Sequence, residues 1–195
     1  MRNDAQSFIF NALRNALYHT AQRRTNEATA RWLNFAVIVL GAATVADLLA
    51  PWGIKVVHLG GLTTVIGALQ LTFDFGGKAR THQMLQHDYY QALADFQALT
   101  EPAENDIAEA NSRLTTIMAN EPPIMKAVDA KAYNDAIDAT GFFAQNQRLK
   151  VPWWHHWFRN FLAFEGANYL TIEEDKALAE KRRTAKKGKN ANATT

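Results

Sequence analysis

The stretch GGLTTVIGALQLTFDFGG, residues 60–77, decides between two folds for this chain. It is apolar enough to lie in lipid, yet it carries three threonines, a glutamine and an aspartate. Small and polar residues recur in it at spacings of three and four, which keeps them within an arc of about 80° on a helix that turns roughly 100° per residue. The sequence therefore predicts one helix with a continuous small and polar stripe, formed by Gly60, Thr63, Gly67, Gln70 and Asp74.

A second apolar segment precedes this helix. Residues 32–49, WLNFAVIVLGAATVADLL, contain no lysine or arginine and one acid, and the turn APWGIK separates them from residues 56–75. A membrane-spanning helix needs roughly 20 apolar residues, within a range of about 17–25, and both segments qualify. Their charges lie near the ends, where polarity costs least. The pattern predicts a two-helix transmembrane hairpin.

Folding the hairpin at Trp52 and Gly53 brings residues whose numbers sum to about 105 to the same depth. Asp47 then faces His58 as a candidate pair across the turn. The next facing pairs each contain a glycine, which predicts close approach of the two backbones, as in helices that associate in lipid. These pairs are Thr44 with Gly61, Gly41 with Thr64, and Ile38 with Gly67.

The flanking charges predict the orientation of the hairpin. Six basic residues lie just outside the two segments and one lies in the turn, so the positive-inside rule predicts both termini in the cytoplasm. The first thirty residues are amphipathic and lack the pattern of a cleaved signal peptide. The six outer residues are Arg14, Arg23, Arg24, Arg31, Lys78 and Arg80, and the turn residue is Lys55.

The alternative fold for this chain is a soluble helical bundle with both apolar helices at its centre.

The rest of the chain is also predicted to be helical, so the fold class is all-α with cytoplasmic helical extensions. Amphipathic spacing predicts a helix from Ser7 to about Arg24 and helices over 82–99, 106–119 and 124–140. Gly141 is expected to end the last of these helices. The basic end, EKRRTAKKGKNANATT, is predicted to be disordered. It either solubilises the chain or attracts anionic headgroups. We expect four regions: an amphipathic helix over 1–31, the hairpin over 32–75, a helical region over 76–170, and a charged helix end with the tail over 171–195.

Residues 152–164, PWWHHWFRNFLAF, place three tryptophans, two phenylalanines and a leucine on one helical face. Two interpretations stay open. The face lies in the membrane interface, where tryptophan is enriched, or it packs against the soluble helices, each of which needs an apolar partner.

Several function classes have no signal. The net charge of +2 does not indicate a nucleic-acid partner, and the absence of cysteine removes disulfides and thiolate chemistry. His82 and His87 point about 140° apart on a helix, and His155 and His156 are adjacent, so neither pair shares a ligand face. No phosphate loop or nucleophile motif is present, and Glu121 is best interpreted as a helix-start carboxylate. We expect no enzyme activity, cofactor or metal.

Three tracts together resemble one protein family. HLGGLTTVIGALQLTFDFGGKARTHQMLQHDYYQAL, ANEPPIMKAVDAKAYNDA and TNEATARWLNFAVIVLGA are similar to SLATT-domain proteins, the SMODS- and SLOG-associating two-transmembrane effector domains of bacteria. The resemblance covers about residues 8–165. The matching positions are Thr63, Thr64, Gly67 and Asp74 in the second apolar segment, His82 just after it, and Glu121, Pro122, Pro123, Tyr133 and Asn134.

The resemblance implies an effector of antiviral or other conflict defence in the bacterial inner membrane. Such proteins are predicted to form homo-oligomeric pores that disrupt the membrane and are gated by a partner, including nucleotide-second-messenger synthases or sensors. A ring of hairpins would point the stripe inward, and aspartate rings favour cations. We therefore expect Thr63, Thr64, Gly67, Gln70 and Asp74 to line a pore or to pack helix against helix. The alternative function is a non-conducting membrane scaffold that recruits a soluble partner.

Overall fold

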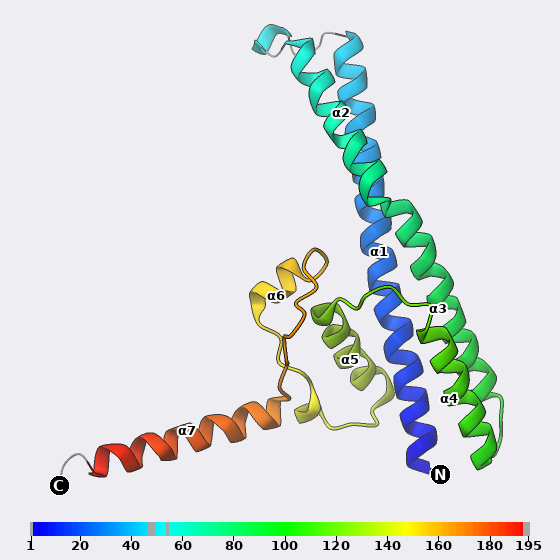
Figure 1. Cartoon of the computed structure of the whole chain (residues 1–195), viewed down its shortest axis with the longest axis vertical. Coiled ribbons are helices and arrows are strands. Elements are labelled where there is room, and N and C mark those ends of the chain that lie inside the picture. The colour runs from blue at the N-terminus through cyan, green and yellow to red at the C-terminus, as the bar shows by residue number, and fades with distance from the viewer. Residues whose placement is uncertain (1, 47–49, 54, 193–195) are drawn as a thin grey trace. The chain divides into compact units, whose positions relative to one another are not determined.

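A computed structural model describes residues 2–46, 50–53 and 55–192, and within them the fold is all-α, as predicted (Figure 1). Strand pairing in this part of the chain is limited to one isolated antiparallel bridge between Leu149 and Thr171. The helices are α1 (Arg2–Ala46), α2 (Val56–Phe73), α3 (Phe75–Gln97), α4 (Glu104–Met118), α5 (Lys126–Thr140), α6 (Trp153–Phe158) and α7 (Ile172–Asn192), with short 3-10 turns η1 (Ala50–Trp52) and η2 (Gln145–Gln147).

The chain divides into two compact units. One is His19–Met84, and the other joins the chain through Tyr18 with the chain from Leu85 onward. Both α1 and α3 therefore contribute residues to each unit.

The core of the unit that contains the termini forms where the first turns of α1 pack against α3 and α4. Phe8 is the largest α1 side chain in it, and its ring lies 4.4 Å from that of Phe96, centroid to centroid. Apolar residues at spacings of three and four supply one buried face from each helix. The buried members are Phe8, Ala12, Ala16, Leu85, Tyr89, Ala92, Leu93, Phe96, Ile107, Leu114 and Ile117.

The opposite face of α1 packs against α5. Phe10 contacts Ala136 and Ile137, and Tyr133 meets the Phe10 ring edge-on at 5.2 Å. Arg14 of the same helix forms a bidentate ion pair with Asp129, with nitrogen–oxygen distances of 2.9 and 2.6 Å. The N-terminal part of α1 thus lies between α3–α4 and α5, and it is the apolar partner that those helices required.

Helix ends depend on local capping. Gly141, at φ 64°, ends α5 with its N–H donating to the Ile137 carbonyl, as the sequence predicted. Helix α4 begins two residues earlier than expected, and the Asp106 carboxylate accepts from the Ala103 N–H at its start. Helix α5 begins at Lys126, two residues later than expected.

The chain end differs from the disordered tail that we expected, because α7 continues to Asn192. Thr171 and Glu174 form a reciprocal capping box: the Thr171 hydroxyl accepts from the Glu174 N–H, and the Glu174 carboxylate accepts from the Thr171 N–H. Acidic residues in the first turn favour the same helix through the macrodipole. This local start signal accounts for helix in a segment with few apolar residues.

In the unit His19–Met84, α2 lies beside the later part of α1 (Figure 1). The Gln70 amide nitrogen donates to the Asn34 side-chain oxygen at 2.8 Å. These two residue numbers sum to 104, so the facing register agrees with the value near 105 that the sequence predicted. Of the α2 residues, only Leu59 is buried.

One described helical stretch, Val56–Gln97, contains a window long and apolar enough to cross a membrane. The mean hydropathy of that window is 1.5, and only 6% of it is buried inside the protein. The other expected segment, 32–49, ends at residues outside the described part of the chain. One such helix is compatible with membrane association.

Candidate functional site

The two candidate pore-lining threonines of α2, Thr63 of the stripe and Thr64 beside it, satisfy their hydroxyls on their own helix. Thr63 donates to the Leu59 carbonyl and Thr64 to the Gly60 carbonyl, each at 2.9 Å. On α1, Thr44 donates to the Leu40 carbonyl in the same way. A hydroxyl bonded to the carbonyl four residues earlier leaves no unpaired donor, so these side chains are tolerated in an apolar environment.

Gln70 is the stripe residue that contacts the neighbouring helix, through its bond to Asn34. The glycines do not bring the two backbones together as we expected. A Cβ added at Gly41, Gly61 or Gly67 would meet no atom within 4 Å. The prediction of close backbone approach at these positions is therefore wrong within one chain. Gly67 and Gln70 are still half-buried, so this face of α2 is turned toward α1.

Asp74 forms the junction between α2 and α3. It adopts a left-handed conformation at φ 38°, and its N–H donates to the Gln70 carbonyl to end α2. Its carboxylate accepts from the Gly77 N–H at 2.9 Å, which makes it the N-cap of α3. A Cβ at Gly77 would lie 2.0 Å from the Asp74 carboxylate, so this cap needs glycine there. The Asp74 side chain is exposed, and α3 begins here and not at 82.

The structure describes one residue of the candidate pair Asp47–His58. His58 is exposed on the first turn of α2, and Asp47 lies outside the described residues.

His82 has a partner that sequence analysis missed. Its Nδ1 atom lies 2.8 Å from Nδ1 of His19, and both rings are buried. One ring must donate and the other accept, so this contact requires at least one neutral imidazole. The two residues are 63 positions apart, and no local motif connects them. The hairpin register was the only signal, since it places position 82 opposite position 23, one helical turn from His19.

The motif residues of the unit that contains the termini hold its loops together. Glu121 lies in the connection before α5, and it accepts a 2.5 Å hydrogen bond from the Tyr89 hydroxyl of α3. It is not the helix-start carboxylate that we predicted, because α5 begins five residues later. Burial, reinforced by the Glu121 carboxylate, raises the pKa of the Tyr89 phenol well above its usual value. The phenol therefore stays protonated and donates.

Asn134 and Tyr133 perform similar roles on α5. The Asn134 amide donates to the Leu149 carbonyl at 2.9 Å and accepts from the Leu149 N–H at 2.7 Å, which holds the strand-like segment beside the helix. The Arg14 guanidinium lies 5.5 Å above the Tyr133 ring. Pro122 is half-buried and Pro123 is exposed in the connection between α4 and α5. These contacts give the motif positions structural roles.

Replacing Tyr89 with phenylalanine is expected to lower the free energy of unfolding by about 1–3 kcal/mol, because the Glu121 carboxylate loses its phenol donor. The pKa of this phenol is raised by folding, so its contribution is present below the ordinary tyrosine pKa of about 10 and is lost as the pH rises above it. Thermal unfolding of the full chain in detergent between pH 7 and 11 measures both effects. Tyr90→Phe, at an exposed neighbour, is the matched control. Equal midpoints for the two variants would contradict the role of the bond.

The aromatic segment is not packed as one of our two interpretations required. Helix α6 covers only Trp153–Phe158, and His155 is the only buried residue of 153–162. The packing interpretation is therefore wrong for the tryptophans. The physical reason is that the N-terminal part of α1 already covers α3, α4 and α5.

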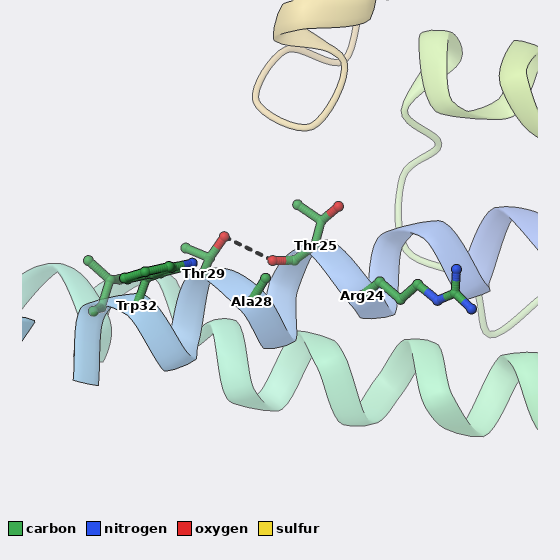
Figure 2. Close-up of a pocket in the computed structure, with 6 residues that line it drawn as sticks. Arg24, Thr25, Ala28, Thr29 and Trp32 are labelled. Carbon is green, nitrogen blue, oxygen red and sulfur yellow. Dashed lines mark hydrogen bonds between the residues drawn. The ribbon is translucent and has the colours of Figure 1, made fainter. Parts of the chain in front are cut away.

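A shallow hollow runs along α1 (Figure 2). Arg24 lies at one end and Trp32 at the other, with Thr25, Ala28 and Thr29 between them, and the Thr29 hydroxyl donates to the Thr25 carbonyl. Its lining comes from one helix, so it does not enclose a ligand. Arg24 and Trp32 are eight positions apart, so they lie about 12 Å apart along the helix axis.

Among the described residues, no three histidine, aspartate or glutamate side chains come together in a group that could hold a metal ion. No protein-family model, curated protein or solved structure matches the chain. Within the described residues the fold is all-α, and one helical stretch there is apolar enough to cross a membrane.

Proposed function

We propose that residues 32–75 form a two-helix transmembrane hairpin and that the chain is an integral membrane protein of the bacterial inner membrane with both termini in the cytoplasm. The observation that carries this proposal is the exposure of large apolar side chains on both helices. Ile38 is 69% exposed, Val65 56% and Leu71 87%. In a soluble bundle centred on these helices, such side chains would be buried against protein.

The dimensions and polar contacts support the same proposal. The 18 residues of α2 extend about 27 Å, close to the hydrocarbon thickness of about 30 Å. The threonine hydroxyls donate to carbonyls of their own helix, and Gln70 bonds to Asn34. Fewer polar groups of the two helices therefore need water as a hydrogen-bond partner. Trp32, with Arg24 about two helical turns before it, follows the order of an aromatic belt and a basic cytoplasmic flank.

We further propose that several copies assemble into a pore that disrupts membrane integrity in bacterial conflict defence, gated by a nucleotide signal or a partner protein. The resemblance to SLATT-domain proteins supports this function. Gly61 supports assembly, because it is exposed on α2 and a Cβ there would meet no atom within 4 Å, which leaves room for the close approach of a second helix. Asp74, exposed at the end of α2, would supply the carboxylate ring at one mouth.

One observation favours the second candidate, a non-conducting membrane scaffold. Thr63 and Thr64 already donate to their own helix and Gln70 donates to Asn34, so these candidate pore-lining residues offer few free donors to a water-filled path. Overexpression in bacteria distinguishes the candidates. A pore is expected to arrest growth with loss of membrane potential, and a scaffold leaves the potential intact.

Asp74→Asn tests the pore assignment with little change in structure. Asparagine and aspartate are equally good N-caps and both tolerate the left-handed conformation, so the junction is retained while the charge is lost. If Asp74 faces the lumen, cation preference and unitary conductance in proteoliposomes fall several-fold.

Gly77→Ala is the control, because it keeps the Asp74 charge and displaces the cap. Currents and selectivity that Asp74→Asn leaves unchanged would remove Asp74 from the lumen. Absence of any depolarisation by the overexpressed wild-type chain would favour the scaffold.

A further inference from the structure

The surface that the proposed function leaves unused is an aromatic patch on α6 and the turn after it. Trp153, Trp157 and Phe161 are 75%, 76% and 73% exposed, an unusual density of uncovered aromatic area for one short segment. We define the aromatic patch by its six residues: Trp153, Trp154, Trp157, Phe158, Phe161 and Leu162.

The patch is held in place by the residues behind it. His155 points inward and is buried, its ring stacks on Phe164 at 3.9 Å, and its Nδ1 atom lies 2.6 Å from the Tyr169 hydroxyl. The Lys126 N–H donates to the Ala163 carbonyl, which ties the turn to the start of α5. The aromatic side chains are therefore presented outward by a fixed support and are not the frayed end of a helix.

The charges around the patch are basic. Residues 152–164 contain Arg159 and no acid, and Lys126 is exposed where the turn meets α5. Partial desolvation lowers the pKa of the largely exposed His156, and the nearby charges of Arg159 and Lys131 lower it further, so the neutral imidazole predominates at pH 7. Lys131 is paired with Asp135, and Glu165 is the first acid after the patch. The cations left to face a partner are those of Arg159 and Lys126.

We propose that the aromatic patch docks on the surface of an anionic bilayer, with its indoles at the headgroup level and Arg159 and Lys126 on lipid phosphates. Indole prefers the interface because its ring is apolar and its N–H is polar. Basic side chains beside it complement anionic headgroups. A chain anchored by its own apolar helix also keeps the patch at high effective concentration near the membrane. The proposal does not require the hairpin to conduct.

Fluorescence of the full-length chain in vesicles tests the docking. Trp32→Phe and Trp52→Phe, at two highly exposed positions, leave the patch as the only source of indole emission. We expect this emission to shift to the blue and to be quenched by brominated acyl chains. The quenching should be stronger in vesicles with phosphatidylglycerol than in phosphatidylcholine alone, and Arg159→Ser should reduce that difference. Emission that stays red-shifted and fully accessible to iodide in both vesicles would overturn the proposal.

A second measurement separates lipid from protein as the occupant. The chain has no cysteine, so Trp157→Cys places a single thiol in the patch, and Met118→Cys, at an exposed position on α4, is the matched control. Docking on lipid predicts no preferential disulfide cross-linking between copies at either position. Strong cross-linking at Trp157→Cys, together with indoles shielded from iodide but not quenched by brominated lipid, would show that a second copy covers the patch and would overturn docking on lipid.

Discussion

Replacing Val65 with arginine is expected to stop the chain from integrating into membranes. Val65 lies in the middle of α2, and its side chain is 56% exposed. An arginine at the centre of a span opposes insertion by about 2.5–3.5 kcal/mol, which is roughly a 100-fold change in the insertion equilibrium. The helix has little margin to absorb this cost, because it already contains glycine, threonine and histidine among its 18 residues.

Fractionation after a carbonate wash measures the effect. The wild-type chain is expected in the membrane pellet and Val65→Arg largely in the supernatant or in aggregates. Met118→Arg is the matched control, since Met118 is 50% exposed on α4 and an ordinary surface substitution changes stability by less than about 0.5 kcal/mol.

The same substitution gives the opposite result if the hairpin stands in water. An arginine would then interrupt an exposed apolar patch and improve solubility without cost. A soluble, folded, monomeric Val65→Arg protein, obtained beside an equally soluble wild type, would refute the membrane hairpin.

The features that sequence analysis predicted are those encoded locally. Apolar spacing and turn residues gave the helices, Gly141 gave the end of α5, and the position of the turn gave a register that the Asn34–Gln70 bond follows. Each depends on residues close together in sequence or on one simple fold-back. The spacing of the stripe was equally visible, but the spacing alone could not reveal that its threonines would bond to their own helix.

The features that sequence analysis missed depend on which faces of the helices pack against one another. Nothing in the local pattern connects Tyr89 with Glu121 or His19 with His82, because the rotation of each helix is set by packing of the whole unit. The aromatic segment misled us for the same reason. Its apolar face looked like the missing core element, whereas Phe8 and Phe10 on opposite faces of α1 fill that position.

Replacing Phe8 with alanine is expected to cause the largest loss of stability in the soluble core. Phe8 is 1% exposed, and its ring contacts Phe96 of α3. Truncation of a buried phenylalanine leaves a cavity and costs about 3–5 kcal/mol, a large fraction of the 5–15 kcal/mol that typically stabilises a folded domain. The loss should be local to the helices that surround the ring, which are α3 from Leu85 onward and α4.

Hydrogen exchange of the full chain in lipid nanodiscs measures this loss segment by segment. Peptides from 85–97 and 104–118 are expected to exchange roughly 100-fold faster or more, because each 1.4 kcal/mol of lost local stability is a factor of ten. Phe142→Ala is the control, since Phe142 is 39% exposed and its truncation leaves no closed cavity. Unchanged protection in Phe8→Ala would mean that the first turns of α1 do not hold this core.

The two substitutions together test whether the hairpin and the soluble core are separately stabilised. Phe8→Ala removes protein contacts and leaves residues 32–73 untouched, so the variant should remain in the carbonate-resistant pellet while α3 and α4 lose protection. Val65→Arg removes the preference for lipid and leaves the Phe8 core intact, so its α3 and α4 peptides should keep their protection in detergent. Extraction of Phe8→Ala from the membrane would show instead that integration depends on the soluble core, which lipid burial of the apolar faces does not predict.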